Sequence, residues 1–298
     1  MSSGNKQLRV SMPSDGGGVN DVCHSNQSDL HPRDRHIMPH PRVKVILWGH
    51  FYVTHPDAAT TVTQLVTNIV SGRYMNNLSQ YGIGRGSFVD VSVVDTDNLA
   101  PAPHSLSDSD AQDQLIQWLR AGFIAPAPAV NEHNLLYLLF PPLTTILTPE
   151  DVGFGGYHHY GKFNGDSDND DLFWAIFRTG PGFANQSSGA DLIASISGVI
   201  SHEMTEAFTD RDDDGFRTSN GCEISDLCEE LGNFTYEGFG VEKYWSNWDH
   251  SCIQGNNPVR LRRFLKAVAH SETPPKGVRW TGMPRIGLED IAAKMRSQ

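Results

Sequence analysis

The sequence predicts a mixed α/β (α+β) domain with a sheet of about five strands, a long central helix and a helical C-terminal region. Three observations lead to this prediction. Short apolar runs rich in β-branched residues alternate with segments whose apolar residues recur at helical spacing. One helical pattern runs for about five turns and is apolar on more than one side, which is typical of a buried helix. The 298 residues include 38% hydrophobic side chains, enough for a sizeable core.

Five segments have the composition expected of strands, and helical patterns lie between or after them. The predicted strands are residues 42–49, 87–94, 133–140, 156–160 and 171–177. The first helical pattern, which Gly72 ends, is carried by Val62, Leu65, Val66, Ile69 and Val70. A second helix begins after the N-cap Ser107 and ends at Gly122. The longest helix begins at Ser187 or Ser188 and continues to Phe208.

The chain divides into three parts by composition. Residues 1–41 are rich in small and polar residues without periodicity, so we expect a flexible leader or a loosely docked one. Residues 42–255 would form the α/β domain. Residues 256–298 carry nine Lys or Arg against three acidic residues, which predicts a basic helical C-terminal extension. This extension would dock on the acidic body or lie near it, or bind a membrane or an acidic partner.

Charge and hydropathy exclude some classes of protein. The net charge of −12 argues against a general nucleic-acid binder, because phosphate neutralisation needs concentrated positive charge. No apolar run approaches the roughly 18–20 residues of a membrane-spanning helix. The first 30 residues lack the basic-then-apolar layout of a signal peptide. We therefore expect a soluble protein with no transmembrane segment.

The four cysteines are too few for a disulfide scaffold. Three of them lie close together in the sequence, so one local bridge would form in an oxidising compartment. The preferred pair is Cys228 with Cys252, and the alternative is four free thiols.

The most informative motif is HExxE, within the segment SHEMTEAFTD on the long helix. His202 and Glu206 are four residues apart and so share one helix face, where they can bind one metal ion together. Glu203 lies one step around the helix, where its carboxylate can take a proton from an attacking water. The zinc-peptidase helix has a second His where this chain has Glu206. The added negative charge favours harder metals such as Mn or Ca more than the usual motif does.

Several segments together resemble one protein family. HEMTEAFTD, CEISDLC (Cys222–Cys228) and WSNWDHSC (Trp245–Cys252), with LWGHF, YMNNLSQYG and GYHHY upstream, resemble the EXORDIUM/phosphate-induced protein family. The microbial relatives of that family carry labels that suggest zinc metallopeptidases. The resemblance spans about residues 43–252, and its most specific part is HExxEAxTD followed by ExxDxC. Carried over, it points to His202, Glu203, Glu206, Asp210, Glu223 and Cys228.

The resemblance implies a zincin-like fold, in which the HExxE helix is the active-site helix. The predicted order of strand, helix, strand, helix, three strands and then the HExxE helix is how zincin-type domains are built. Plant members of the family look like extracellular proteins related to growth, which suggests an extracellular location here. This chain departs from the family at Arg211, where the family usually has Pro.

The third metal ligand is less well defined than the first two. Glu223 is favoured because it lies downstream in the resembling segment, and Asp226 and Asp212 come next. A histidine would give a more conventional charge balance, and the candidates are His158, His159 and His250.

Calcium is a second candidate cofactor. The acidic run from Asp210 to Gly215 copies the first half of an EF-hand loop, but Gly221 occupies the position of the expected bidentate Glu. Asp166, Asp168 and Asp170 repeat the alternation of acids without the glycine.

The leading hypothesis is a zinc-dependent metallopeptidase-like hydrolase that acts on a peptide or protein substrate. Its zinc ligands would be His202, Glu206 and Glu223, and its catalytic residue Glu203. The main alternative is a non-catalytic secreted or cell-surface protein of the EXORDIUM type with a structural zinc or calcium site. A third hypothesis is an interaction protein that uses its basic residues 256–298.

Overall fold

A five-stranded sheet forms the centre of the structure. A computed structural model describes residues 23, 29–34, 36–95, 103–129, 131–148, 155–163, 171–180 and 188–255, all within the unit Met1–Asn256. The strands of the sheet are β2 (Arg42–Trp48), β3 (Ser87–Val94), β5 (Leu135–Phe140), β7 (Gly156–Lys162) and β8 (Asp171–Phe177). Their order is β3-β2-β5-β8-β7, with β7 antiparallel to β8 and the other pairs parallel. The predicted mixed α/β fold with a five-stranded mixed sheet is confirmed.

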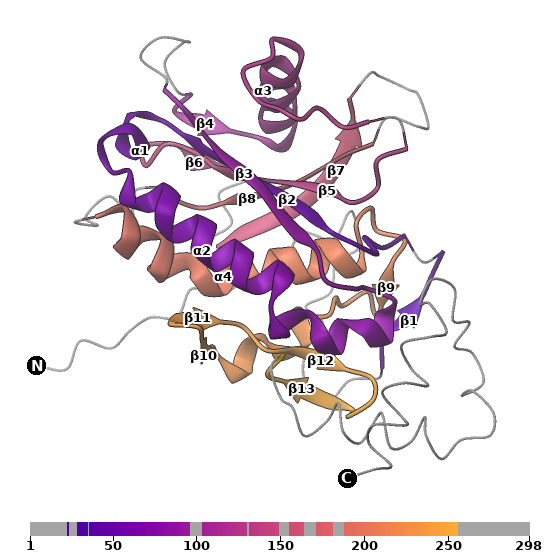
Figure 1. The fold of residues 1–298 in the computed structure, drawn as a ribbon. Coiled ribbons are helices and arrows are strands. Elements are labelled where there is room, and N and C mark those ends of the chain that lie inside the picture. Colours follow the sequence, from indigo (N-terminus) through magenta and orange to yellow (C-terminus); the bar gives the residue numbers. More distant parts are fainter. Residues whose placement is uncertain are drawn as a thin grey trace, which may run out of the picture. The chain divides into compact units, whose positions relative to one another are not determined.

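Helices cover both faces of this sheet (Figure 1). The helices are α1 (His50–Thr54), α2 (Asp57–Ser71), α3 (Asp108–Arg120) and α4 (Gly189–Thr209), with 3₁₀ helices at η1 (Arg73–Tyr81) and η4 (Asp226–Leu231). The apolar residues of α2 and α4 pack on one face of the sheet, and those of α3 pack on the other. Two N-caps are confirmed, because Ser107 accepts a hydrogen bond from the Asp110 N–H and Ser188 accepts one from the Asp191 N–H.

The central strand β5 shows why the sheet is buried on both sides. All six of its residues are buried, as its continuous apolar sequence predicts for a central parallel strand. One face carries Leu136, Leu138 and Phe140 toward α2 and α4, and the other carries Leu135, Tyr137 and Leu139 toward α3.

The second half of helix α4 is fully buried. Its residues from Ser201 to Thr209 are all buried. At Gly198, an added Cβ would lie only 2.3 Å from the side-chain nitrogen of Asn233, so the side chain of Asn233 fills the space beside this glycine. The second half of α4 is therefore enclosed by other elements, which matters because the HExxE motif lies there.

Short strand pairs surround the sheet, and the sequence did not predict them. They are β1 (His31–Pro32) with β9 (Phe216–Arg217), β4 (Ser105–Leu106) with β6 (Ile146–Leu147), β10 (Phe234–Tyr236) with β11 (Phe239–Val241), and β12 (Tyr244–Ser246) with β13 (Ser251–Ile253). Strands of two or three residues are too short to show a period-two pattern, so tertiary contacts decide them.

Part of the expected leader packs against the domain. Strand β1 pairs with β9, and Leu30 and Met38 are buried in the core. A disulfide joins Cys23 to Cys222, and a second joins Cys228 to Cys252. The predicted Cys228–Cys252 bridge is thus confirmed. The bridge at Cys23 attaches the leader to the segment that follows α4.

Two predictions fall outside the described residues. These are the basic helical extension at 256–298 and the acidic run of Asp166, Asp168 and Asp170. In the parts of the chain that the structure describes, no helix combines the length and apolar character needed to span a bilayer.

Candidate metal centre

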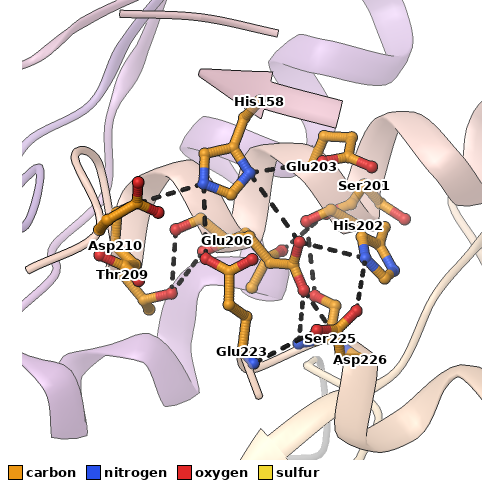
Figure 2. Close-up of polar contacts among 12 residues, drawn as sticks. His158, Ser201, His202, Glu203, Glu206, Thr209, Asp210, Glu223, Ser225 and Asp226 are labelled. Carbon is orange, nitrogen blue, oxygen red and sulfur yellow. Dashed lines mark hydrogen bonds and ion pairs between the residues drawn. The ribbon is translucent and has the colours of Figure 1, made fainter. Parts of the chain in front are cut away.

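A buried cluster of histidines and carboxylates lies where α4 meets β7 and the segment after α4 (Figure 2). Helix α4 contributes His202, Glu203 and Glu206, and none of these side chains is exposed to solvent. His158 from β7 and Glu223 from the following segment are also buried. Because buried ionisable groups are costly unless they are paired or bind a metal, this cluster is the first candidate for a functional site.

His202 is held so that one ring nitrogen faces the carboxylates. Its Nδ1 lies 2.5 Å from Glu242 Oε2. Its Nε2 lies 3.1 Å from Glu206 Oε2 and 3.6 Å from Asp226 Oδ1. A histidine that binds a metal usually gives its other nitrogen to a carboxylate in this way, which fixes the tautomer and the ring orientation. Glu242 therefore leaves Nε2 as the ring nitrogen that could bind a metal ion.

His158 approaches the same carboxylates from the sheet. Its Nδ1 lies 3.4 Å from Glu203 Oε2 and 3.9 Å from Glu206 Oε2. Its Nε2 lies 3.2 Å from the backbone carbonyl oxygen of Asp210 and 3.5 Å from Glu223 Oε1. His158 thus contacts all the carboxylates that the sequence selected as catalytic or metal-binding.

The segment after α4 completes the cluster. The N–H groups of Ser225 and Asp226 donate hydrogen bonds to Glu206 Oε1, over 3.3 and 3.1 Å. Arg217 Nη2 lies 3.1 Å from Glu223 Oε1 and also pairs with Asp213, while its Nε pairs with Asp210. The Cys228–Cys252 disulfide fixes η4, the short helix that begins at Asp226.

Two groups of three side chains in the described part of the chain have the arrangement of a metal site. One contains His158, Glu206 and Glu223, and the other His202, Glu203 and Glu206. In each group one ligand atom per residue lies within 4.8 Å of the others. His202 Nε2, Glu203 Oε1 and Glu206 Oε2 are buried and make no hydrogen bond of good geometry, although Nε2 and Oε2 lie 3.1 Å apart as an ion pair. Since buried polar atoms are nearly always satisfied, these three atoms fit a bound cation.

Burial and neighbouring charges shift the pKa values of several groups in the cluster. Burial alone would lower the pKa of His158, but the carboxylates of Glu223, Glu203 and Glu206 raise it to about 10. Burial raises the pKa of Glu206 to about 7, although His202 opposes the shift. Burial and the Glu206 carboxylate raise the pKa of Glu223 well above its usual range. Without a metal the cluster therefore retains protons near neutral pH, and a cation can replace them.

These shifts predict how the stability of metal-free protein depends on pH. The folded state holds the proton of Glu206 up to about pH 7 and that of His158 up to about pH 10. The unfolded chain releases them near the ordinary values of 4.5 and 6.5. The folded state then binds more protons than the unfolded state, so the free energy of unfolding falls as the pH rises from about 5 to about 10. Urea unfolding of chelator-treated protein across this range checks the sign, and a rise in stability over it would contradict the result.

The structure separates the sequence-predicted residues into those in the cluster and those outside it. His202, Glu203 and Glu206 lie in one group, whereas Glu223 lies in the other, with His158. Asp226 lies beside His202. Asp212 pairs with His36 and Arg211 instead.

The other two candidate histidines lie elsewhere. His159 packs against Trp174, which belongs to the core on the α3 side of the sheet. His250 is largely exposed and pairs with Asp29. Of the three histidines considered from the sequence, the structure therefore brings His158 to the cluster.

Carboxylates of the acidic run after α4 form hydrogen bonds and ion pairs with other groups of the protein. Asp210 accepts a hydrogen bond from the Gly215 N–H and pairs with Arg217, which also pairs with Asp213. Asp212 pairs with His36. The three carboxylates thus have partners among protein side chains and backbone, which does not favour calcium at this run.

Sequence reasoning missed Glu242 and Arg217. Glu242 lies 40 residues after His202, next to the buried Val241 and close to the buried Tyr244. The available signal was a lone acidic residue beside apolar neighbours, which is weak without the fold. Arg217 carried no signal, because its partners come together only through the turn after α4.

Comparisons with known proteins give no information about this site, so its chemistry is interpreted from its own residues. No protein-family model and no curated protein matches the chain.

Proposed function

We propose that this protein is a metal-dependent hydrolase of the zinc metallopeptidase type. The observation that carries the proposal is the buried His202 Nε2–Glu206 Oε2 ion pair beside Glu203 Oε1, which has no hydrogen-bond partner, with His202 oriented by Glu242. The order of the elements, in which the HExxE helix follows the five strands of the sheet, supports a zincin-like fold. The resemblance of HEMTEAFTD and CEISDLC to the EXORDIUM family supports zinc as the metal.

Each residue has a distinct role in this proposal. His202 Nε2 and Glu206 Oε2 would hold the ion. Asp226, 3.6 Å from His202 Nε2, is better placed than Glu223 as the third ligand, because Glu223 lies with His158 and Arg217. The bound ion would supply Lewis-acid activation of water and of the substrate carbonyl. Glu203, with one carboxylate oxygen free of hydrogen bonds, accepts the proton of the attacking water.

His158 and Arg217 position the carboxylates. The imidazole of His158 lies 3.4 Å from Glu203 Oε2, which fixes the orientation of the base. Arg217 pairs with both Asp210 and Glu223 and so holds the segment after α4 against the helix. These contacts keep the catalytic carboxylate in place before a substrate arrives.

A peptide is the substrate class that the fold favours. Strand β7, which carries His158, lies at the edge of the sheet. An extended peptide can pair with an edge strand through main-chain hydrogen bonds. A peptide held along β7 would run beside the residue that contacts Glu203.

A structural metal site in a non-catalytic protein is the second candidate function. The complete burial of His202, Glu203 and Glu206 favours it, since a catalytic ion needs an approach for substrate. Both candidates agree with the two disulfides, which are typical of secreted or cell-surface proteins. We propose an extracellular location for either function.

Metal-dependent peptide hydrolysis separates the two functions. Zinc-loaded protein is expected to cleave unstructured peptides, to lose this activity on treatment with a chelator, and to regain it on addition of zinc. A mixture of peptides analysed by mass spectrometry is the measurement, with Mn²⁺ and Ca²⁺ as alternative metals because the site is rich in carboxylates. A folded, zinc-containing protein that cleaves none of them would favour the structural role.

A further inference from the structure

We propose that the cluster binds two divalent cations side by side, with the Glu206 carboxylate shared between them. The inference rests on the proposed function, because the first ion is the one held by His202 and Glu206. The second ion would be held by His158, Glu206 and Glu223. The site would then be a two-metal centre instead of a single-ion one.

The first argument is the arrangement of the ligand groups. The two groups of three have Glu206 in common, and one contains His158 while the other contains His202. Figure 2 shows Glu206 between the two histidines. Donors bound to one zinc ion at about 2.0–2.2 Å lie within roughly 4.4 Å of one another. In each group the ligand atoms lie within 4.8 Å of one another, which is close to this value. Small side-chain shifts would therefore bring the three ligand atoms of each group onto one ion.

The second argument is the orientation of the histidines. Each has one ring nitrogen that contacts an acceptor outside the groups: His202 Nδ1 contacts Glu242, and His158 Nε2 contacts the Asp210 carbonyl oxygen as well as Glu223 Oε1. The other nitrogen of each ring faces Glu206 Oε2, at 3.1 Å from His202 and 3.9 Å from His158. This is the pattern of metal-binding histidines, whose second nitrogen bonds a carboxylate or a backbone carbonyl. It occurs on both sides of Glu206.

The third argument concerns the two oxygens of Glu206. Oε1 accepts hydrogen bonds from the N–H groups of Ser225 and Asp226, which fixes the carboxylate. Oε2 is buried, makes no hydrogen bond of good geometry and is the Glu206 oxygen that forms ion pairs with both histidines. Two-metal hydrolase sites hold their ions about 3.5–4 Å apart. A single carboxylate oxygen between two imidazoles is suited to bridge such a pair.

The charge of the cluster allows a second ion to bind in place of protons. Six carboxylates surround the cluster: Glu203, Glu206, Asp210, Glu223, Asp226 and Glu242. Arg217, which pairs with Asp210 and Glu223, offsets one of these charges. With neutral histidines as ligands, five negative charges remain, so one divalent ion leaves three and two ions leave one. Uncompensated buried charge is strongly unfavourable, so the remaining charge must be offset either by a second ion or by protons on His158 and Glu223.

Zinc stoichiometry tests the proposal on the full-length, oxidised protein. Equilibrium dialysis against zinc followed by elemental analysis is expected to give two ions per chain for the wild type. His158→Ala and Glu223→Gln are each expected to keep one ion, and Glu206→Ala to lose both because it removes the shared ligand. His159→Ala is the matched control, since it changes the next residue of β7, which packs against Trp174. It should keep two ions.

Circular dichroism confirms that each variant is folded. If His158→Ala does not fold, Glu223→Gln tests the second ion on its own.

The outcomes distinguish this proposal from the proposed function. One ion in the wild type, unchanged in His158→Ala, would overturn the second site and leave the first in place. Two ions retained in both His158→Ala and Glu223→Gln would also overturn it, because the second ion would then lie elsewhere on the protein. No bound zinc in the folded wild type would overturn both proposals together.

Discussion

Glu203→Gln is expected to lower kcat/KM for peptide hydrolysis by about 10²–10⁴-fold, the usual contribution of a general base. Glutamine has nearly the same shape but cannot accept the proton of the attacking water. The side chain is fully buried beside His158, so an isosteric replacement preserves the packing. Metal content should not change, because His202 and Glu206 remain. Steady-state kinetics on a cleaved peptide gives the rate, and elemental analysis gives the metal.

A matched variant checks that the loss comes from this position. Glu237→Gln makes the same chemical change at an exposed residue of the turn between β10 and β11. It should keep wild-type activity. Unchanged activity in Glu203→Gln, with metal bound, would show that Glu203 is not the base.

Zinc is expected to stabilise the wild type strongly and Glu206→Ala hardly at all. A ligand that binds only the folded state raises the free energy of unfolding by about 4 kcal/mol when its free concentration is a thousand times Kd. Glu206 contacts His202 and belongs to both ligand groups, so its removal should abolish this gain. Urea unfolding with and without zinc measures the gain in each protein.

The quantity to compare between the proteins is the increase in the free energy of unfolding on adding zinc, not the free energy of unfolding itself. Glu206→Ala also removes the acceptor of two backbone N–H groups, which changes stability by itself. Glu237→Ala, at the exposed turn, is expected to show the full gain. An equal gain in Glu206→Ala and the wild type would place the stabilising zinc outside the cluster.

The elements with strong local patterns could be predicted from the sequence. The run LLYLLF became β5, and the apolar periodicity after Ser188 became α4. In both cases burial follows directly from the side chains themselves, since every position of β5 is apolar and α4 is apolar on several sides. The N-cap at Ser107 was predictable for a similar reason, because its hydrogen bond to the Asp110 N–H is local.

The completion of the site depends on contacts between distant segments and could not be predicted. His158 and His159 are neighbours on one strand and point to opposite faces, so only the position of β7 in the sheet decides which one meets α4. Glu242 reaches His202 across 40 residues, through strands too short to recognise. The sequence located His202, Glu203 and Glu206 because helical spacing is local, and it left the remaining ligands open for the opposite reason.

Metal content is the most direct test of the central claim that this buried cluster holds a divalent cation. The wild type and Glu206→Ala are purified in parallel, incubated with zinc, dialysed and examined by elemental analysis, with circular dichroism to confirm folding. The account predicts at least one zinc ion per chain in the wild type and none in the folded variant. A folded wild type that retains no divalent metal after this treatment would contradict it.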